Sequence, residues 1–172
     1  MTKNLTRTIL TLATALLCVA LIIFIFSNSL DNASESSAKS DAVHKVVNDT
    51  ARSVGFKREI TKPFIRQSAH VLEFAALGAS SALTLVFALS PAPKQKLSCR
   101  LLFSTLSIPF CAFIALIDEY IQNFSDGRVF DVSDIFTDTC GSICGSIFTV
   151  SVFLILRLIF KLKQKKSAQS AS

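Results

Sequence analysis

TILTLATALLCVALIIFIF, residues 8–26, is an apolar stretch without a single charged side chain. It matches the roughly 20 apolar residues that a helix needs to cross the hydrocarbon core of a bilayer. Lys3 and Arg7 precede it, as basic residues precede a secretory signal. However, the apolar stretch is longer than a usual signal core, and the following SNSLDNASES offers no clear cleavage site with small residues. We therefore expect an uncleaved membrane anchor.

Other apolar stretches follow at 69–89, 101–117 and 135–156. The chain of 172 residues is 51% hydrophobic and 17% charged, and its mean hydropathy is positive. A water-soluble domain of this size would rarely have such a composition. The sequence therefore predicts an all-α fold, an integral membrane four-helix bundle that forms one domain over residues 1–172. The expected spans are 8–26, 66–89, 100–121 and 133–157.

The basic residues beside these spans predict the topology. They form three groups: Lys3 and Arg7; Lys94, Lys96 and Arg100; and Arg157, Lys161, Lys163, Lys165 and Lys166. Because basic residues in short loops are retained in the cytoplasm, we expect both termini there, with a basic cytoplasmic tail at 158–172. Lysines beside anionic lipid headgroups also account for the net charge of +6, so we expect a membrane-lipid partner and no nucleic acid.

The long polar segment 27–62 is the expected first outer loop. Its first half, SNSLDNASESSAKSD, is rich in serine and has too few apolar residues to fold by itself, so we expect turns there. In its second half, apolar residues recur at helical spacing, which predicts a short amphipathic helix on the outer membrane surface, with a flexible loop as the alternative. These apolar residues are Val43, Val46, Val47, Ala51 and Val54. Gly55 is expected to stop this helix, and Pro63 to open the next one.

The other connections are short. SPAPKQKLSCR, residues 90–100, contains two prolines that should separate the second and third spans, which then pack antiparallel. Asp126 and Gly127 predict a turn between the third and fourth spans. Pro109 lies within the third span, where it should kink the helix and release a backbone carbonyl.

The five cysteines are scattered through apolar sequence and do not form a disulfide framework. Cys140 and Cys144 are one helical turn apart, as metal ligands can be. They lie, however, within DTCGSICGS, where Gly141 and Gly145 would let two helices approach closely. We expect this segment to be a packing surface.

Ionisable residues gather at the outer ends of the last three spans. On the second span, Arg66, His70 and Glu73 share one helix face. The other members of this group are Asp118, Glu119, Arg128, Asp134 and Asp138, and the neutral amide of Gln122 accompanies them. Ionisable groups inside a membrane are costly, so they usually face the bundle interior or water and are candidates for function.

These residues also carry a family resemblance. The sequence resembles the VanZ-like family, named after a protein linked to teicoplanin resistance in glycopeptide-resistant bacteria. The resemblance rests on FIFSNS at 24–29, IRQSAHVLEFAALG at 65–78 and DEYIQNFSDGRVFDVSDIFTDTCGSICG at 118–145. It implies a multi-pass protein of the bacterial cell membrane that influences glycopeptide susceptibility, but it implies no particular reaction.

The family pattern can be matched residue by residue. It selects His70, Glu73, Asp118, Glu119, Gln122, Gly127, Arg128, Asp134 and Gly141. Two positions depart from it: Phe74 stands where tyrosine is frequent, and Asp138 stands where asparagine is expected. The second departure adds a negative charge to the group.

Three interpretations of the group remain open. In the first, it is a catalytic or metal site, with His70, Glu73, Asp118 and Glu119 as catalytic candidates. A divalent metal would then be held by His70, Glu73, Asp118 and Asp134, which is a ligand set suited to Zn²⁺, Mn²⁺ or Mg²⁺. No G-x-S-x-G or H-E-x-x-H motif specifies a reaction.

In the second interpretation, the group binds an outer-leaflet lipid, a lipid-linked cell-wall precursor or a glycopeptide without chemistry. The binding residues would be Arg66, Gln122, Arg128, Asp134 and Asp138, with the arginines pairing to phosphate or carboxylate. In the third, it is a structural ion-pair network in which Arg66 and Arg128 balance the carboxylates of three helices.

Overall fold

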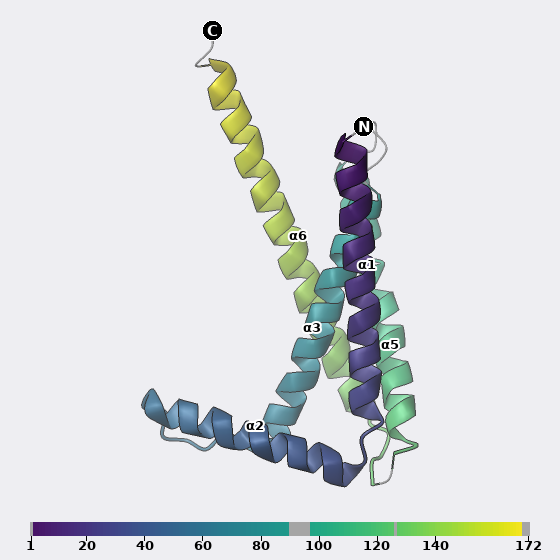
Figure 1. Ribbon diagram of the computed structural model, residues 1–172, viewed down its shortest axis with the longest axis vertical. Helices are drawn as coiled ribbons and strands as arrows, with labels where there is room; N and C mark the ends of the chain where they lie inside the picture. The colour runs from purple at the N-terminus through teal and green to yellow at the C-terminus, as the bar shows by residue number, and fades with distance from the viewer. Residues whose placement is uncertain (1, 90–96, 126, 170–172) are drawn as a thin grey trace.

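The computed structural model describes residues 2–89, 97–125 and 127–169. These ranges contain helices and no strand, as the sequence predicts (Figure 1). The helices are α1 (Thr2–Ser29), α2 (Ala33–Ser53), α3 (Lys62–Ala88), α4 (Leu97–Ser104), α5 (Ser107–Gln122) and α6 (Val132–Gln169).

Four helical stretches are long and apolar enough to cross a membrane: Asn4–Ser29, Lys62–Ala88, Leu101–Gln122 and Val132–Gln164. They run alternately up and down, so that both termini lie at one end of the bundle and α2 lies across the other end (Figure 1). This arrangement confirms the predicted membrane helical bundle. We refer to the two ends as the terminal end and the α2 end.

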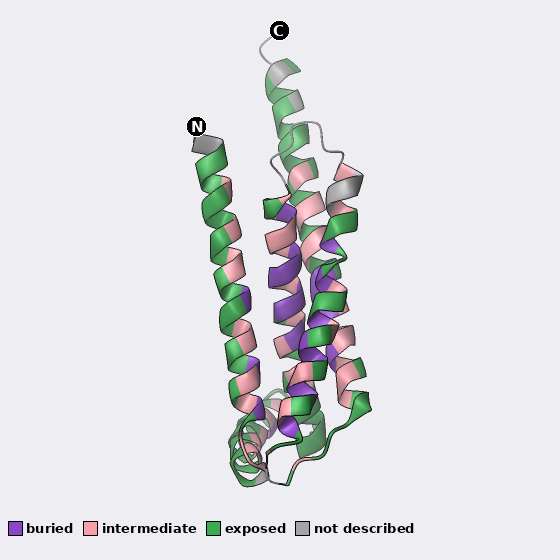
Figure 2. Cartoon of the chain, turned by 90° about the vertical axis from the view of Figure 1, so that its right-hand side faces the viewer, coloured by how far each residue is buried: buried purple, intermediate pink, exposed green. Residues whose placement is uncertain are grey.

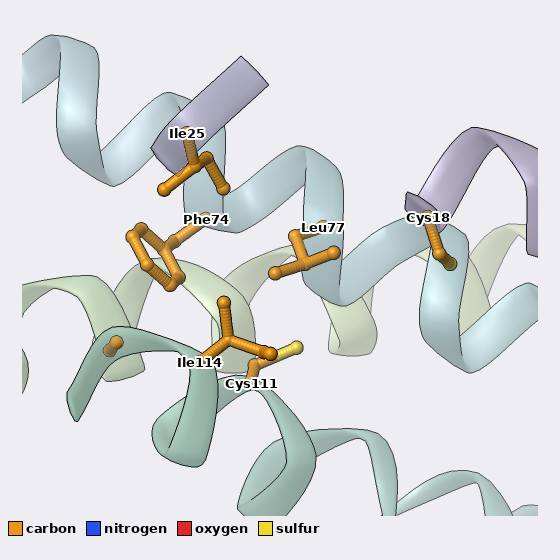
Figure 3. Close-up of a cluster of buried hydrophobic side chains, with 7 residues drawn as sticks. Cys18, Ile25, Phe74, Leu77, Cys111 and Ile114 are labelled. Carbon is orange, nitrogen blue, oxygen red and sulfur yellow. The ribbon is translucent and has the colours of Figure 1, made fainter. Parts of the chain in front are cut away.

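The bundle has a small apolar core and a broadly apolar exterior. Cys18 and Ile25 of α1 meet Phe74 and Leu77 of α3 and residues of α5 (Figure 3). Buried positions concentrate where α3, α5 and α6 face one another, whereas α1 is exposed along its outer side (Figure 2). Large apolar side chains such as Leu16 point away from the bundle. In a bilayer the lipid tails cover such side chains, so their exposure carries no penalty.

The α2 helix is longer than its apolar pattern predicts. It begins at Ala33, so the serine-rich residues 33–41 are helical, and our expectation of turns there was wrong. The reason is a capping box: the Glu35 backbone N–H donates to Asn32 Oδ1 at 2.9 Å, and the Asn32 N–H donates to Glu35 Oε2 at 3.3 Å. These two bonds satisfy free donors at the helix start, which compensates for the poor helical propensity of serine.

The other end of α2 follows the prediction. Gly55 has φ +89°, and the Phe56 N–H donates to Ala51 O at 2.9 Å, which is a glycine stop of the Schellman type. The buried Asn48 side chain then exchanges two hydrogen bonds with the Ile60 backbone, at 2.8 and 3.0 Å. Pro63 lies in the first turn of α3, as expected. Together these contacts hold α2 across the start of α3.

The third span is broken into two helices. The helix α4 ends at Ser104 and α5 starts at Ser107. Pro109 has no N–H to donate to the carbonyl of residue 105, and its ring would clash with that carbonyl in a continuous helix. The Thr105 carbonyl instead accepts from the Ile108 N–H at 3.0 Å. The predicted kink is therefore present, and it lies one turn before the proline.

Small residues allow α3 and α6 to cross closely. A Cβ atom added to Gly141 would lie 2.5 Å from the carbonyl oxygen of Val71, and one added to Gly145 would collide with the backbone of Ala75. On α3, Gly78 faces the backbone of Ser142 in the same way. The prediction that this part of α6 is a packing surface is confirmed.

The cysteines whose side chains are described are free: Cys18, Cys111, Cys140 and Cys144. Of the expected loop features, Lys94, Lys96 and Asp126 lie outside the described residues. Gly127, which follows Asp126, has φ +78°, a conformation that suits a turn and favours glycine.

Candidate functional site

The predicted ionisable residues meet at the α2 end of the bundle. His70 and Glu73 come from the first half of α3, and Asp118 and Glu119 come from the last turn of α5. On α6, Asp138 lies one turn after Asp134. The close crossing of α3 and α6 at Gly141 sets the distance between these groups, because it brings the two helix backbones together within one turn of Asp138.

Asp118 is fully buried and is held by neutral donors. The Ser29 hydroxyl donates to Asp118 Oδ1 at 2.5 Å, and the Gln122 amide donates to Oδ2 at 2.9 Å. A carboxylate excluded from water needs such bonds, because burying its charge without partners is very costly. The Gln122 bond joins residues one turn apart on α5, whereas the Ser29 bond ties α5 to the end of α1.

The two glutamates are also held by neutral donors. Asn28 Nδ2 donates to Glu73 Oε1 at 3.2 Å, and the backbone N–H of Asp131 donates to Glu119 Oε2 at 3.0 Å. Glu119 Oε1, by contrast, is buried without a hydrogen-bond partner.

The arginines do not pair with these carboxylates. Among the described residues, no ion pair within 4.0 Å includes Arg66 or Arg128. Arg128 donates from Nη2 to the Ser36 hydroxyl of α2 at 2.8 Å, but its Nε and Nη1 are buried without partners. Burial lowers the pKa of Arg128, and the nearby charge of Arg66 lowers this pKa further. These contacts do not form the ion-pair network of the third interpretation.

Two adjoining cavities, each lined mostly by polar and charged residues, lie beside these arginines. The larger, of about 480 Å³, lies between α2, α3, the Gly127–Asp131 loop and the start of α6. The smaller, of about 230 Å³, lies between the end of α1, α2 and α3. Arg66, His70 and Arg128 line both cavities. The larger cavity is within the size range of small-molecule sites, about 300–1,000 Å³.

A group of metal-type ligands adjoins the cavities. One donor atom each from His70, Asp118 and Asp138 lies within 4.8 Å of the other two. Both carboxylate oxygens of Asp138 and Nδ1 of His70 are buried without hydrogen bonds, and His70 Nδ1 lies 3.9 Å from Asp138 Oδ2. Of the expected metal set of His70, Glu73, Asp118 and Asp134, this group contains His70 and Asp118, and Asp138 completes it.

The remaining predicted residues line the surroundings of this group. Asp134 lines the larger cavity with Gln122, and Glu73 lines the smaller one. Asp134 is partly buried, whereas Gln122 is almost fully buried. All the residues singled out in the sequence thus lie in or next to one polar region at the α2 end.

Sequence reasoning missed three contributors from the first part of the chain. Asn28 and Ser29 bond Glu73 and Asp118, and Ser36 accepts from Arg128. A signal for the first two was present in FIFSNS, since a polar pair directly after an apolar span is well placed to bond groups on neighbouring helices. Ser36 lies in the segment where we expected turns, so its position on a helix was not available to predict its contact with Arg128.

Among the curated proteins and the solved structures, none matches this chain. A sequence profile described as VanZ/LLP1 matches residues 12–160, a range that includes the second and third spans completely, most of the first and fourth, and every residue of the site. This multi-pass membrane protein therefore belongs to the VanZ/LLP1 family.

Proposed function

We propose that this protein binds the phosphate group of an anionic lipid, or of a lipid-linked cell-wall precursor, in the cavity at the α2 end. The observation that carries the proposal is Arg128, whose Nε and Nη1 are buried without partners beside a cavity that Arg66 also lines. A guanidinium offers donors in a fixed planar fork that suits phosphate oxygens. An anion between the two arginines would supply the missing acceptors and offset their mutual repulsion.

The carboxylates of the region do not compete strongly for these arginines. Glu73, Asp118 and Glu119 already accept hydrogen bonds from neutral donors. Asp131 and Asp134 line the larger cavity and limit how many negative charges it can accept. We therefore favour a single phosphate group with a polar substituent over a highly charged ligand.

The position of the cavity favours a membrane ligand. Residues of α2 and of the adjoining ends of the candidate spans line the cavity. Figure 1 shows α2 crossing that end of the bundle, which is the level at which lipid headgroups would lie. The basic residues at the terminal end favour an orientation with both termini in the cytoplasm and the α2 end in the outer leaflet of a bacterial cell membrane. A protein that held a wall precursor there would alter the access of a glycopeptide antibiotic to that precursor. We propose that the protein influences glycopeptide susceptibility in this way.

Lipid retention in nanodiscs tests the proposal. The full chain is placed in phosphatidylcholine nanodiscs containing a few phosphatidylglycerol or undecaprenyl phosphate molecules, and native mass spectrometry measures which lipids remain bound. Arg66→Gln and Arg128→Gln should each weaken retention about tenfold or more, because a charge-assisted contact is lost. Retention of one lipid and not the other would identify the headgroup or the lipid-linked phosphate as the ligand.

Arg52→Gln is the matched control, since Arg52 is an exposed cation near the end of α2 and does not line either cavity. It should retain lipid like the wild type. Equal losses in all three variants would mean that the basic surface attracts anionic lipid without a specific site, and the proposal would be rejected.

A further inference from the structure

We infer that His70, Asp118 and Asp138 bind one divalent metal ion of the Zn²⁺ or Mn²⁺ class between α3, α5 and α6. The inference goes beyond the proposed phosphate site, because it concerns different atoms and does not require a lipid ligand. It rests on the donor set, on the burial of its members and on the bonds that orient them.

Asp138 is the strongest indication of a missing ligand. Its side chain has no exposed surface, and both carboxylate oxygens lack a hydrogen-bond partner among the described residues. Burying an unpaired carboxylate costs several kcal/mol, on the order of what binding a cation can repay. The nearest basic group is the His70 imidazole, whose Nδ1 is 3.9 Å from Asp138 Oδ2 and is itself unpartnered.

The donor positions are compatible with one metal after small side-chain movements. The three donor atoms lie within 4.8 Å of one another. Two ligands of a tetrahedral zinc ion, each about 2.1 Å from the metal, are about 3.4 Å apart. A contraction of at most about 1.4 Å by side-chain rotation would therefore close the site.

The surroundings of Asp118 resemble the outer shell of a metal site. Ser29 and Gln122 each donate to one carboxylate oxygen of Asp118, which fixes the plane of the group and leaves lone pairs for a metal. Outer hydrogen bonds of this kind orient the ligands of metal sites and tune their affinity. An imidazole nitrogen with two carboxylates suits Zn²⁺ and Mn²⁺, and three protein ligands leave coordination positions open.

The ends of α1, α3, α5 and α6 all contribute to this site, which explains why it is not apparent in any one segment. His70 also lines both polar cavities, so the metal would adjoin the region where we place the phosphate. The thiols of Cys140 and Cys144 are not among the donors.

Metal retention by the purified full chain tests the inference. The protein is stripped with a chelator in detergent, dialysed against Zn²⁺ or Mn²⁺ alone, desalted and analysed by inductively coupled plasma mass spectrometry. The wild type should retain about one equivalent of at least one of these metals, as a single three-ligand site predicts. His70→Ala and Asp138→Asn should each lower the affinity at least about tenfold, because a ligand is removed or loses its charge.

Asp49→Asn is the matched control, because it removes the same charge as Asp138→Asn from an exposed residue of α2 that lines neither cavity and is not in the donor group. It should bind metal like the wild type. Thermal unfolding in chelator confirms that each variant is folded, and added metal should raise Tm in the wild type and the control but not in the two ligand variants. The inference is overturned if the wild type retains neither metal, or if Asp49→Asn loses as much metal as Asp138→Asn.

Discussion

The hydrogen bonds of Asp118 illustrate how single residues make a buried acidic site possible in a membrane. This carboxylate is shielded from water, yet its partners are a serine hydroxyl and a glutamine amide and not an arginine. Neutral donors of this kind leave the nearby arginines free to bind something else. Arg66 and Arg128 line the cavities, whereas amides and hydroxyls hold the acidic side chains.

Ser29→Ala tests the contribution of one such donor. Loss of a hydrogen bond to a buried ionisable group should lower the free energy of unfolding by about 1–3 kcal/mol, which appears as a lower Tm of the metal-free protein in detergent. Ser27→Ala is the control, because Ser27 lies two residues earlier on α1 and is exposed. If both substitutions shifted Tm equally, the Ser29–Asp118 bond would contribute nothing specific.

At the scale of elements, the pairing of α3 with α6 sets the geometry of the site. Glycines let the two backbones approach so closely that a methyl group at Gly78, Gly141 or Gly145 would meet the facing helix. Because lipid tails are as apolar as leucine, such helices associate through close packing and hydrogen bonds more than through a hydrophobic effect. Ser146, whose hydroxyl donates to the Gly78 carbonyl at 3.1 Å, adds a bond of this type.

Gly145→Ala should therefore force α3 and α6 apart. The added methyl would collide with the backbone of Ala75, which cannot rotate away as a side chain can. We expect a loss of about 1–3 kcal/mol in the free energy of unfolding, as for other overpacked cores, together with weaker metal retention because Asp138 moves from His70. Ser151→Ala, at an exposed position of the same helix, should change neither quantity.

Tm and metal content are measured on the same samples of the wild type, Gly145→Ala and Ser151→Ala. Wild-type stability in Gly145→Ala would mean that the two helices are less tightly packed than the structure describes.

At the scale of the whole molecule, the two ends of the bundle differ in their charged residues. The ionisable cluster and α2 occupy one end, and the two termini with most of the described basic residues of α6 occupy the other (Figure 1). The long α6 continues well beyond its contacts with α3 and exposes apolar side chains such as Phe160. This polarity is the basis for the proposed orientation.

Reporter fusions in bacterial cells test that orientation. Green fluorescent protein fused to the C-terminus should fluoresce, because it folds in the cytoplasm, and alkaline phosphatase inserted after Gly55 should be active, because it requires the oxidising exterior. In the control fusions the two reporters change places. Alkaline phosphatase at the C-terminus and green fluorescent protein after Gly55 should both be inactive. Activity of the exchanged pair instead would place the α2 end in the cytoplasm and exclude an outer-leaflet ligand.

Much of the architecture could be predicted locally. Hydrophobic stretches of span length predicted the helices, Gly55 and Pro63 predicted where two of them end and begin, and the glycines of α6 predicted its packing surface. The pattern of α2 was harder, because its first turns contain few apolar residues and depend on the Asn32–Glu35 capping box. A capping box is a weak local signal, and the serine-rich composition of this segment favoured the prediction of turns over a helix.

The sequence by itself determined that this chain is helical, that it has four membrane-spanning stretches and that its ionisable residues gather at one end, because each of these properties depends on length, periodicity and spacing along one segment. Only the tertiary structure decided which of those residues meet. Asp138 joins His70 and Asp118, Ser29 bonds Asp118, and Ser36 bonds Arg128. Such contacts depend on the rotation and separation of helices far apart in the chain, which the close approach at Gly78, Gly141 and Gly145 sets.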